Sequence, residues 1–254
     1  MAPSLLEMNQ EEMFNNDFLV YTLVATAVGI LGGVVGSFWV PNVKARSAIQ
    51  HFAAGLVIAA VASDVIPETE RLGRPLPVIC GFATGGLVMI GLKWLVVRFE
   101  RRERARGKLP IGLAAAAALD TLIDGATISA GFAVGRHLGI LLVVVLAVEL
   151  FFLNLSVGTE FHKGKQKRWR GMALTSGIGS LLLVGALAGN IFLADASEQA
   201  IAVFLAFGAA ALIYLIAEEL LVEAIEAEES LFSTAMLFAG FLCVFAATLI
   251  SRDN

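Results

Sequence analysis

The sequence predicts an all-α membrane protein with eight transmembrane helices. Of its 254 residues, 58% are hydrophobic and only 16% are charged, and the mean hydropathy is +0.82. An average soluble domain has about 25% charged residues. This composition excludes a disordered chain and an ordinary cytosolic enzyme. The apolar runs are continuous rather than alternating, which favours helices over a transmembrane β-barrel.

A spanning helix needs about 20 predominantly apolar residues. Eight runs reach this length, over residues 18–40, 47–66, 77–97, 110–134, 138–158, 171–193, 199–221 and 231–250. We expect one transporter domain over residues 18–250, between an acidic tail of residues 1–17 and a short tail of residues 251–254. The first run follows acidic residues, so we expect no cleavable signal peptide.

The basic residues predict the orientation. When alternate loops share a side, 14 of the 18 Lys and Arg fall together. The positive-inside rule makes this side cytoplasmic. We therefore expect a protein integral to the plasma (inner) membrane with both termini outside the cytoplasm. Loop 222–230 falls inside without a basic residue, but acidic residues count little in this rule.

The first, third and sixth runs contain glycine pairs four residues apart. Examples are Gly29 with Gly33, Gly81 with Gly85 and Gly185 with Gly189. Small residues at this spacing let membrane helices approach closely. These runs are therefore expected to pack in the bundle.

The second and seventh runs form an internal repeat. FAAGLVIAAVASDVIPE (52–68) aligns with FGAAALIYLIAEELLVE (207–223) at a constant offset of 155 residues. This offset matches Asp64 with Glu219 and Glu68 with Glu223. The predicted topology directs one copy outward and the other inward. Inverted repeats of this kind are typical of secondary transporters.

The fourth and fifth runs carry acidic residues at mid-depth. Asp120 and Asp124 share one helix face, and Glu149 lies at a matching depth in the next run. An ionisable group inside the bilayer costs roughly 2.5–3.5 kcal/mol on insertion scales, so it is a functional-site hypothesis. The hydroxyl residues expected near this site are Thr121, Thr127 and Ser156.

Three carboxylates at one level cannot all stay ionised and unpaired. A bound cation, protons, or both can compensate them; protonated carboxyls that hydrogen-bond between helices are the structural alternative. Oxygen ligands without His or Cys suit hard cations such as Mn²⁺, Mg²⁺ or Ca²⁺. We predict a metal site formed by Asp120, Asp124 and Glu149.

Further acids flank this centre along the membrane. Asp64 and Glu68 lie near the outer end of the second run, and Glu218, Glu219 and Glu223 lie near the inner end of the seventh. A line of carboxylates is typical of a cation path. The alternative is that the end groups are interfacial and solvated. The three histidines, His51, His137 and His162, fall at membrane edges or in loops.

No catalytic or nucleotide-binding motif is present, so we expect neither an enzyme nor a nucleic-acid partner. Cys80 and Cys243 lie in apolar runs, which makes a disulfide framework or a cysteine zinc site unexpected. The expected partners are the lipid bilayer and a divalent metal ion. The metal would be the substrate, and we expect no cofactor.

Several segments resemble the ZIP (Zrt/Irt-like) family of metal transporters. IYLIAEELLVEA (213–224) is similar to the penultimate helix of that family, and FAAGLVIAAVASDVIPE to its second helix. DTLIDGA (120–126) and ELFFLNLSVG (149–158) lie where the family has its two metal-binding motifs. SGIGSLLLVGALAG (176–189) resembles the family's Ser-Gly-x-x-Glu-Pro helix. The resemblance covers nearly the whole chain.

The resemblance implies helices 1–3 and 6–8 as inverted repeats around helices 4 and 5, in a homodimer. It also exposes departures from the family. The fourth-helix histidine is replaced by Asp120, the asparagine by Thr121, and the acid is kept as Asp124. In the fifth and sixth helices, the family ligand positions are held by Glu149, Leu150, Leu153 and Ser180. One all-oxygen site remains, and a second metal position is dismantled.

The leading hypothesis is transport of a divalent cation that is zinc-, iron- or manganese-like. A different hypothesis is a ZIP-derived sensor or scaffold that no longer transports metal. A third keeps transport but changes the substrate to protons or an organic cation.

Overall fold

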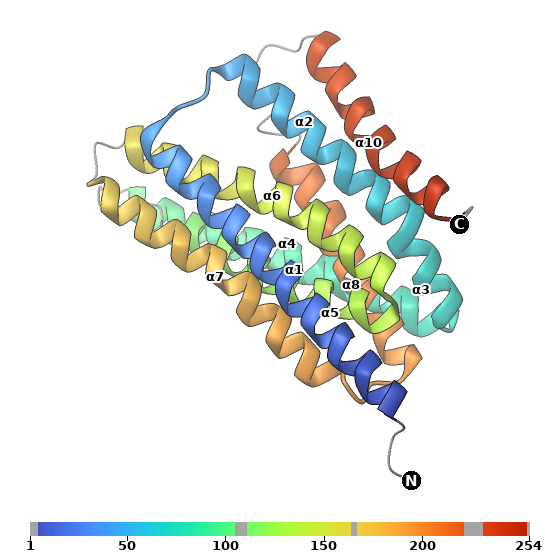
Figure 1. Ribbon diagram of the computed structural model, residues 1–254. Coiled ribbons are helices and arrows are strands. Elements are labelled where there is room, and N and C mark those ends of the chain that lie inside the picture. Colours follow the sequence, from blue (N-terminus) through green and yellow to red (C-terminus); the bar gives the residue numbers. More distant parts are fainter. Residues whose placement is uncertain (1–4, 105–110, 164–166, 221–230, 253–254) are drawn as a thin grey trace.

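The computed structural model describes residues 5–104, 111–163, 167–220 and 231–252. Within these ranges the chain is all-α (Figure 1). Eight helical segments are long and apolar enough to cross a membrane, as the sequence predicts. The elements are α1 (Leu5–Phe38), α2 (Val43–Ala60), η1 (Val61–Val65), α3 (Ile66–Leu72), α4 (Pro75–Arg104), α5 (Ile111–Val134), α6 (Arg136–Lys163), α7 (Arg168–Leu193), α8 (Glu198–Leu215), η2 (Ile216–Leu220) and α10 (Leu231–Arg252).

The second span is longer than the expected run 47–66. It begins at Val43 because the side chain of Asn42 caps the helix by accepting a hydrogen bond from the Ala45 N–H at 2.7 Å. It continues past Pro67 because the π-helical turn η1 leads directly into α3, where proline occupies the first turn. Proline is tolerated there because its missing N–H has no helical partner to lose.

The seventh span repeats this local pattern. The side chain of Ser197 caps α8 by accepting from the Ala200 N–H, and α8 has 18 residues, as α2 does. It too ends in a five-residue π-helical turn, η2. Caps, helix ends and π-turns therefore fall at matching positions, 155 residues apart.

Glycines set the distance between paired helices. On α1, a Cβ at Gly32 would lie 2.0 Å from the Phe151 carbonyl oxygen of α6. On α10, a Cβ at Gly240 would lie 2.1 Å from the Phe52 carbonyl oxygen of α2. Any larger side chain would push these backbones apart. The predicted role of small residues in packing is confirmed at Gly85 and Gly185, where a Cβ would lie 2.5 Å from the Phe207 oxygen and 2.1 Å from the Leu122 oxygen.

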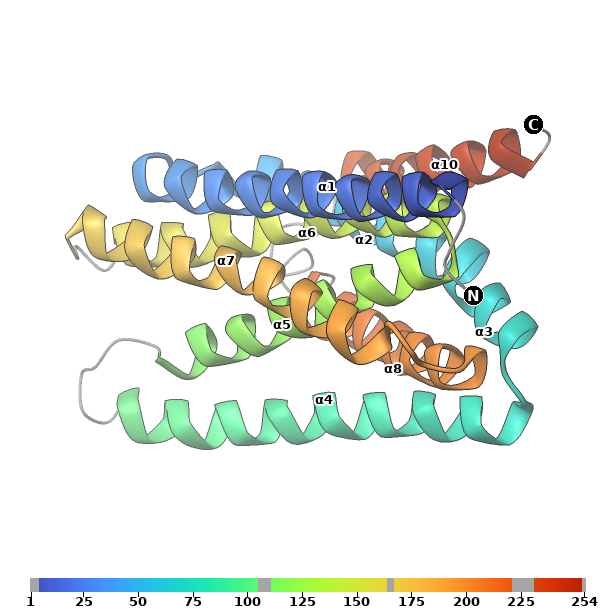
Figure 2. The same cartoon turned by 60° about the horizontal axis from the view of Figure 1, so that its bottom comes forward.

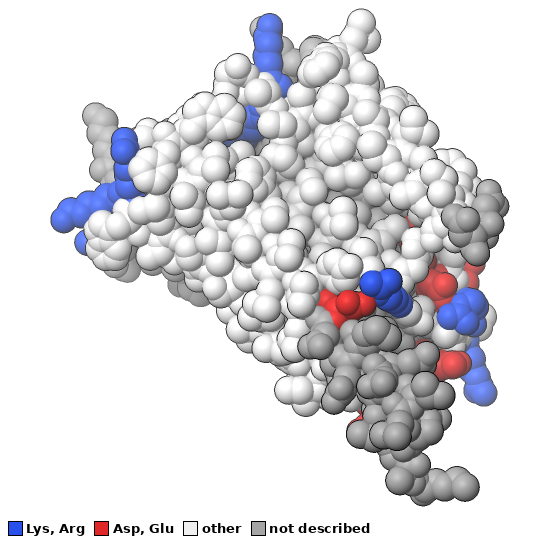
Figure 3. Space-filling model, viewed as in Figure 1, with Lys and Arg blue, Asp and Glu red and all other residues white. Residues whose placement is uncertain are grey.

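The helices lie side by side, with the start of α1 and the end of α10 at the same end of the bundle (Figure 2). The outer surface between the two ends is apolar; α4, for example, exposes Leu76, Leu87 and Trp94. Charged side chains gather at the ends, and Figure 3 shows the uncharged band between them. This distribution is that of an integral membrane protein in contact with lipid.

The most buried part of the bundle surrounds α5 and α6. Ile128 and Phe132 of α5 pack with Leu142 and Leu146 of α6, and all four are almost fully buried. Leu205 and Leu212 of α8 belong to the same core. The two helices that carry the mid-depth acids are therefore enclosed by protein.

Candidate metal centre

The structure brings Asp120, Asp124 and Glu149 together. Each offers one carboxylate oxygen, and these three oxygens lie within 4.8 Å of one another. The side chains are 6%, 2% and 1% exposed, respectively. The three acids that the sequence assigns to one site therefore form one buried carboxylate cluster.

Local helix geometry explains the cluster. Asp120 and Asp124 are one turn apart on α5, so they lie on the same helix face. Glu149 comes from α6, which follows α5 after the single residue Gly135. Such a short connection makes α5 and α6 adjacent in the bundle, so carboxylates at similar depths can meet.

Close backbone contacts hold α5 in place. A Cβ at Gly125 would lie 2.1 Å from the Leu182 carbonyl oxygen of α7. A Cβ at Gly208 of α8 would lie 2.7 Å from the hydroxyl of Thr127. Helix α5 is therefore fixed on both sides immediately beside Asp124. Such support is what keeps a ligand set in a defined geometry.

The dimensions of the cluster fit one cation. Carboxylate oxygens bind Ca²⁺ at about 2.3–2.6 Å and Mg²⁺ at about 2.0–2.1 Å. Two oxygens on opposite sides of such an ion are therefore separated by roughly 4.0–5.2 Å. The three oxygens here lie within 4.8 Å of one another, which a Ca²⁺-sized ion spans, whereas a smaller ion would draw the carboxylates together by up to about 0.6 Å. The donor set, with oxygen only, favours hard cations or Mn²⁺.

Three of the predicted neighbouring hydroxyl groups donate hydrogen bonds to carbonyls of their own helices. Thr121 and Thr127 are buried, and their hydroxyls donate to the carbonyls of Ala117 and Ile123 on the same helix. Ser156 is half-buried on α6. Ser180 is exposed on α7 and donates to the Ser176 carbonyl at 2.8 Å.

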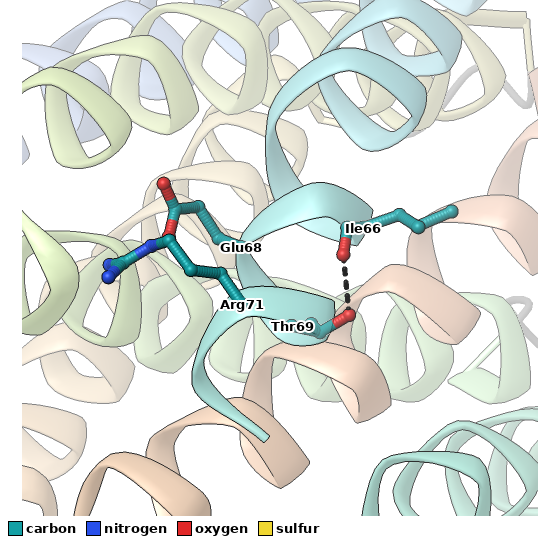
Figure 4. A network of polar contacts seen from close by, with 4 residues as sticks. All are labelled: Ile66, Glu68, Thr69 and Arg71. Carbon is teal, nitrogen blue, oxygen red and sulfur yellow. Dashed lines mark hydrogen bonds and ion pairs between the residues drawn. The ribbon is translucent and has the colours of Figure 1, made fainter. Parts of the chain in front are cut away.

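Of the acids predicted along the path, the structure describes the side chains of Asp64, Glu68 and Glu218. Asp64, in η1, is buried, and Glu68, in α3, is half-buried and forms an ion pair with Arg71 at 2.6 Å. Glu68 and Arg71 point to the same side of α3 in Figure 4, whereas Thr69 turns to the Ile66 carbonyl. Glu218 is exposed and paired with Lys93. The side chain of Glu219, and Glu223 altogether, lie outside the described residues.

Sequence reasoning missed two polar residues. Asn154 of α6 is fully buried, and its Nδ2 donates to the Gly29 carbonyl of α1 at 3.1 Å. His137 is the second residue of α6, and its Nε2 is 3.7 Å from Asp64 Oδ1. A polar residue within an apolar run marks Asn154 in the sequence, whereas the meeting of His137 with Asp64 has no sequence signal.

The sequence matches no protein-family model and no curated protein. The fold and the site by themselves define the class of this protein. It is a polytopic membrane protein with a buried carboxylate cluster suited to a metal ion.

Proposed function

We propose that this protein transports a divalent metal cation across the plasma (inner) membrane, with Asp120, Asp124 and Glu149 as its mid-membrane binding site. The observation that carries the proposal is the cluster itself: three carboxylates within 4.8 Å, each nine-tenths or more buried, in the centre of an eight-span bundle. Acids in this setting are expensive, and a bound cation compensates their charge.

The likeness between the second and seventh spans supports a transporter. Helices α2 and α8 share their length, their type of N-cap and their π-helical ends at an offset of 155 residues. The same offset relates two helix contacts. Phe52 corresponds to Phe207 and Gly85 to Gly240, and the contact of Phe52 with Gly240 has its equivalent in the contact of Phe207 with Gly85. Inverted repeats produce such equivalent contacts, and transporters built from them hold the substrate near the midplane.

The acids at the two ends give the cation a path. Helix α3, which carries Glu68 and directly follows the π-helical turn of Asp64, lies near the end where α1 begins (Figure 2), and Glu218 lies in η2, which directly follows the last residue of α8. Basic residues favour the end of the bundle opposite the start of α1 as the cytoplasmic one, and in this proposal both termini lie outside. A cation then enters past Asp64 and Glu68, binds between α5 and α6, and leaves past Glu218.

The driving force is the electrochemical gradient, because the sequence has no nucleotide-binding motif. Moving two charges across the membrane yields about 4.6 kcal/mol per 100 mV of potential. The carboxylates replace part of the water shell of the ion during transfer. Their oxygen donors suit a manganese-like divalent ion, and the resemblance to the ZIP family adds iron- and zinc-like ions as candidates.

The departures from the ZIP motifs favour a second candidate. Leu153 and Ser180 cannot supply the charged ligands that the family has at these positions. A protein that kept the fold but lost transport would serve as a membrane sensor or scaffold. A transporter of protons or an organic cation is a third candidate, because the same carboxylates would then titrate or form ion pairs without a metal.

Uptake into proteoliposomes tests the proposal. The purified protein is reconstituted, and entry of Mn²⁺, Zn²⁺ and Fe²⁺ is followed with a trapped fluorescent chelator. The variant Asp120→Asn/Glu149→Gln should lose uptake, because it removes two anionic ligands. The matched control Asp195→Asn changes an exposed acid between α7 and α8 and should keep it.

The outcome separates the three candidates. Metal uptake that depends on both acids supports the proposal. Absence of metal uptake together with proton or organic-cation flux supports the third candidate. Absence of all flux supports the scaffold. Unchanged uptake in the double variant would show that the assigned site is wrong.

A further inference from the structure

A second polar site lies near the end of the bundle where α1 begins. A pocket of about 320 Å³ is lined by η1, α3, the α5–α6 connection and α10, and its polar lining residues are Asp64, Glu68, Arg71, His137 and Ser251. Glu68 and Arg71 neutralise each other in an ion pair. The carboxylate of Asp64 therefore supplies the net negative charge of this pocket.

Asp64 and His137 face each other across a gap. Asp64 Oδ1 and His137 Nε2 are 3.7 Å apart, beyond the 2.7–3.2 Å range of N–H···O hydrogen bonds. The carboxylate is 6% exposed, whereas the imidazole is 51% exposed and borders the pocket. One ligand is thus buried and fixed, and the other is accessible from the pocket.

Two hydroxyl groups of α10 contact the remaining polar atoms of the Asp64 carboxylate and the His137 imidazole. Thr248 Oγ1 donates to Asp64 Oδ2 at 2.8 Å, and Ser251 Oγ lies 3.1 Å from His137 Nδ1. In the tautomer whose Nδ1–H donates to Ser251, Nε2 carries the free lone pair, and Nε2 is the ring nitrogen that lies 3.7 Å from Asp64 Oδ1. Metal-bound histidines have this arrangement, because a partner on the second nitrogen fixes the tautomer and the ring orientation.

The gap has the width of a coordinated metal ion. A zinc-like ion binds histidine nitrogen at about 2.0–2.1 Å and carboxylate oxygen at about 2.0–2.2 Å, so two ligands can be at most about 4.2 Å apart. The observed 3.7 Å lies below this limit. Water and, after release from Arg71, Glu68 can complete the coordination.

We propose that Asp64 and His137 form an outer binding site for a transition-series divalent cation, held in place by Thr248 and Ser251. The mixed nitrogen and oxygen donors select Zn²⁺-like ions over Mg²⁺ and Ca²⁺, which prefer oxygen ligands. The role of this site as the entrance to the central cluster rests on the proposed function. Binding at the outer site does not require transport.

Metal titration of the full chain in detergent tests this proposal. Zn²⁺ binding is measured by calorimetry, and Co²⁺ binding by its visible absorption. The wild type should bind two ions, and Asp120→Asn/Glu149→Gln, which lacks the central ligands, should bind one. Adding His137→Ala or Asp64→Asn to this variant should abolish the remaining event. The matched control His162→Ala removes a histidine on α6 at the opposite end and should leave it intact.

A weaker perturbation keeps the test independent of folding. Ser251→Ala should lower the outer affinity by about 10–100-fold, as loss of a partner behind a metal-bound histidine does. The proposal is overturned if the double variant binds no Zn²⁺, or binds it equally with and without His137. Failure of the proposed function has a different signature. Wild type and double variant then bind Zn²⁺ identically, and the single substitution His137→Ala abolishes this binding.

Discussion

Gly125 directly follows Asp124 on α5 and faces the backbone of α7. A Cβ at this position would lie 2.1 Å from the Leu182 carbonyl oxygen and 2.6 Å from the Ala186 nitrogen. Ordinary contact begins near 3.4 Å, so Gly125→Ala must separate α5 from α7 by about 1.3 Å. Overpacking of this kind destabilises by about 1–3 kcal/mol. Metal ligands need positions accurate to about 0.5 Å, so cation binding at Asp124 should weaken as well.

The assay is unfolding of the purified protein in detergent, with and without Mn²⁺. Gly125→Ala should unfold at a lower temperature and gain less stability from the metal than the wild type. The control is Gly177→Ala on α7, where a Cβ meets nothing within 4 Å. This control should unfold at the same temperature as the wild type or at a slightly higher one, because alanine has a higher helix propensity than glycine. Equal behaviour of the two variants would refute the packing argument.

Three further predictions follow from the site, the core and the charge distribution. Lowering the pH from about 7 to about 4, near the ordinary pKa of Asp and Glu carboxyls, should weaken Mn²⁺ binding in a calorimetric titration, because protons then compete for the carboxylate ligands; affinity that rose or stayed constant would contradict carboxylate ligation. Asn154→Leu should lower the free energy of unfolding by about 0.6–1.7 kcal/mol, since the bond to the Gly29 carbonyl is lost, whereas Ser180→Ala on the exposed face of α7 should change it little. In a chain with Cys80 and Cys243 replaced by alanine, Asp195→Cys should react with an impermeant maleimide applied to intact cells and Lys167→Cys only after permeabilisation; the reverse pattern would invert the proposed orientation.

The spans were predictable because burial in lipid imposes a length and a composition that single runs reveal. All eight runs correspond to helices in the structure. Their ends were less predictable. The helix beginning at Leu5 includes most of the residues expected as a tail, and α4 continues to Arg104, beyond the expected end at 97. Polar residues can extend a helix outside the bilayer, where hydropathy gives no signal.

The central cluster was predictable because its three members are acidic residues at equal depth in consecutive apolar runs. The position of Asp120 and Asp124 on one face follows from the helical period alone. The site at His137 was not predictable, because it depends on α10 meeting η1 and the start of α6. Such a contact is set by packing of distant segments, and no spacing in the sequence encodes it.

The most direct test of the central claim is a melting scan against divalent cations in a His137→Ala background, where only the central cluster is expected to bind. A cation present at a hundred times its Kd should stabilise the protein by about 2.7 kcal/mol. The account predicts such a shift with Mn²⁺ or a related ion, and its loss when Asp120→Asn and Glu149→Gln are added. No shift with any cation, or a shift that survives both substitutions, would contradict a metal site at this cluster.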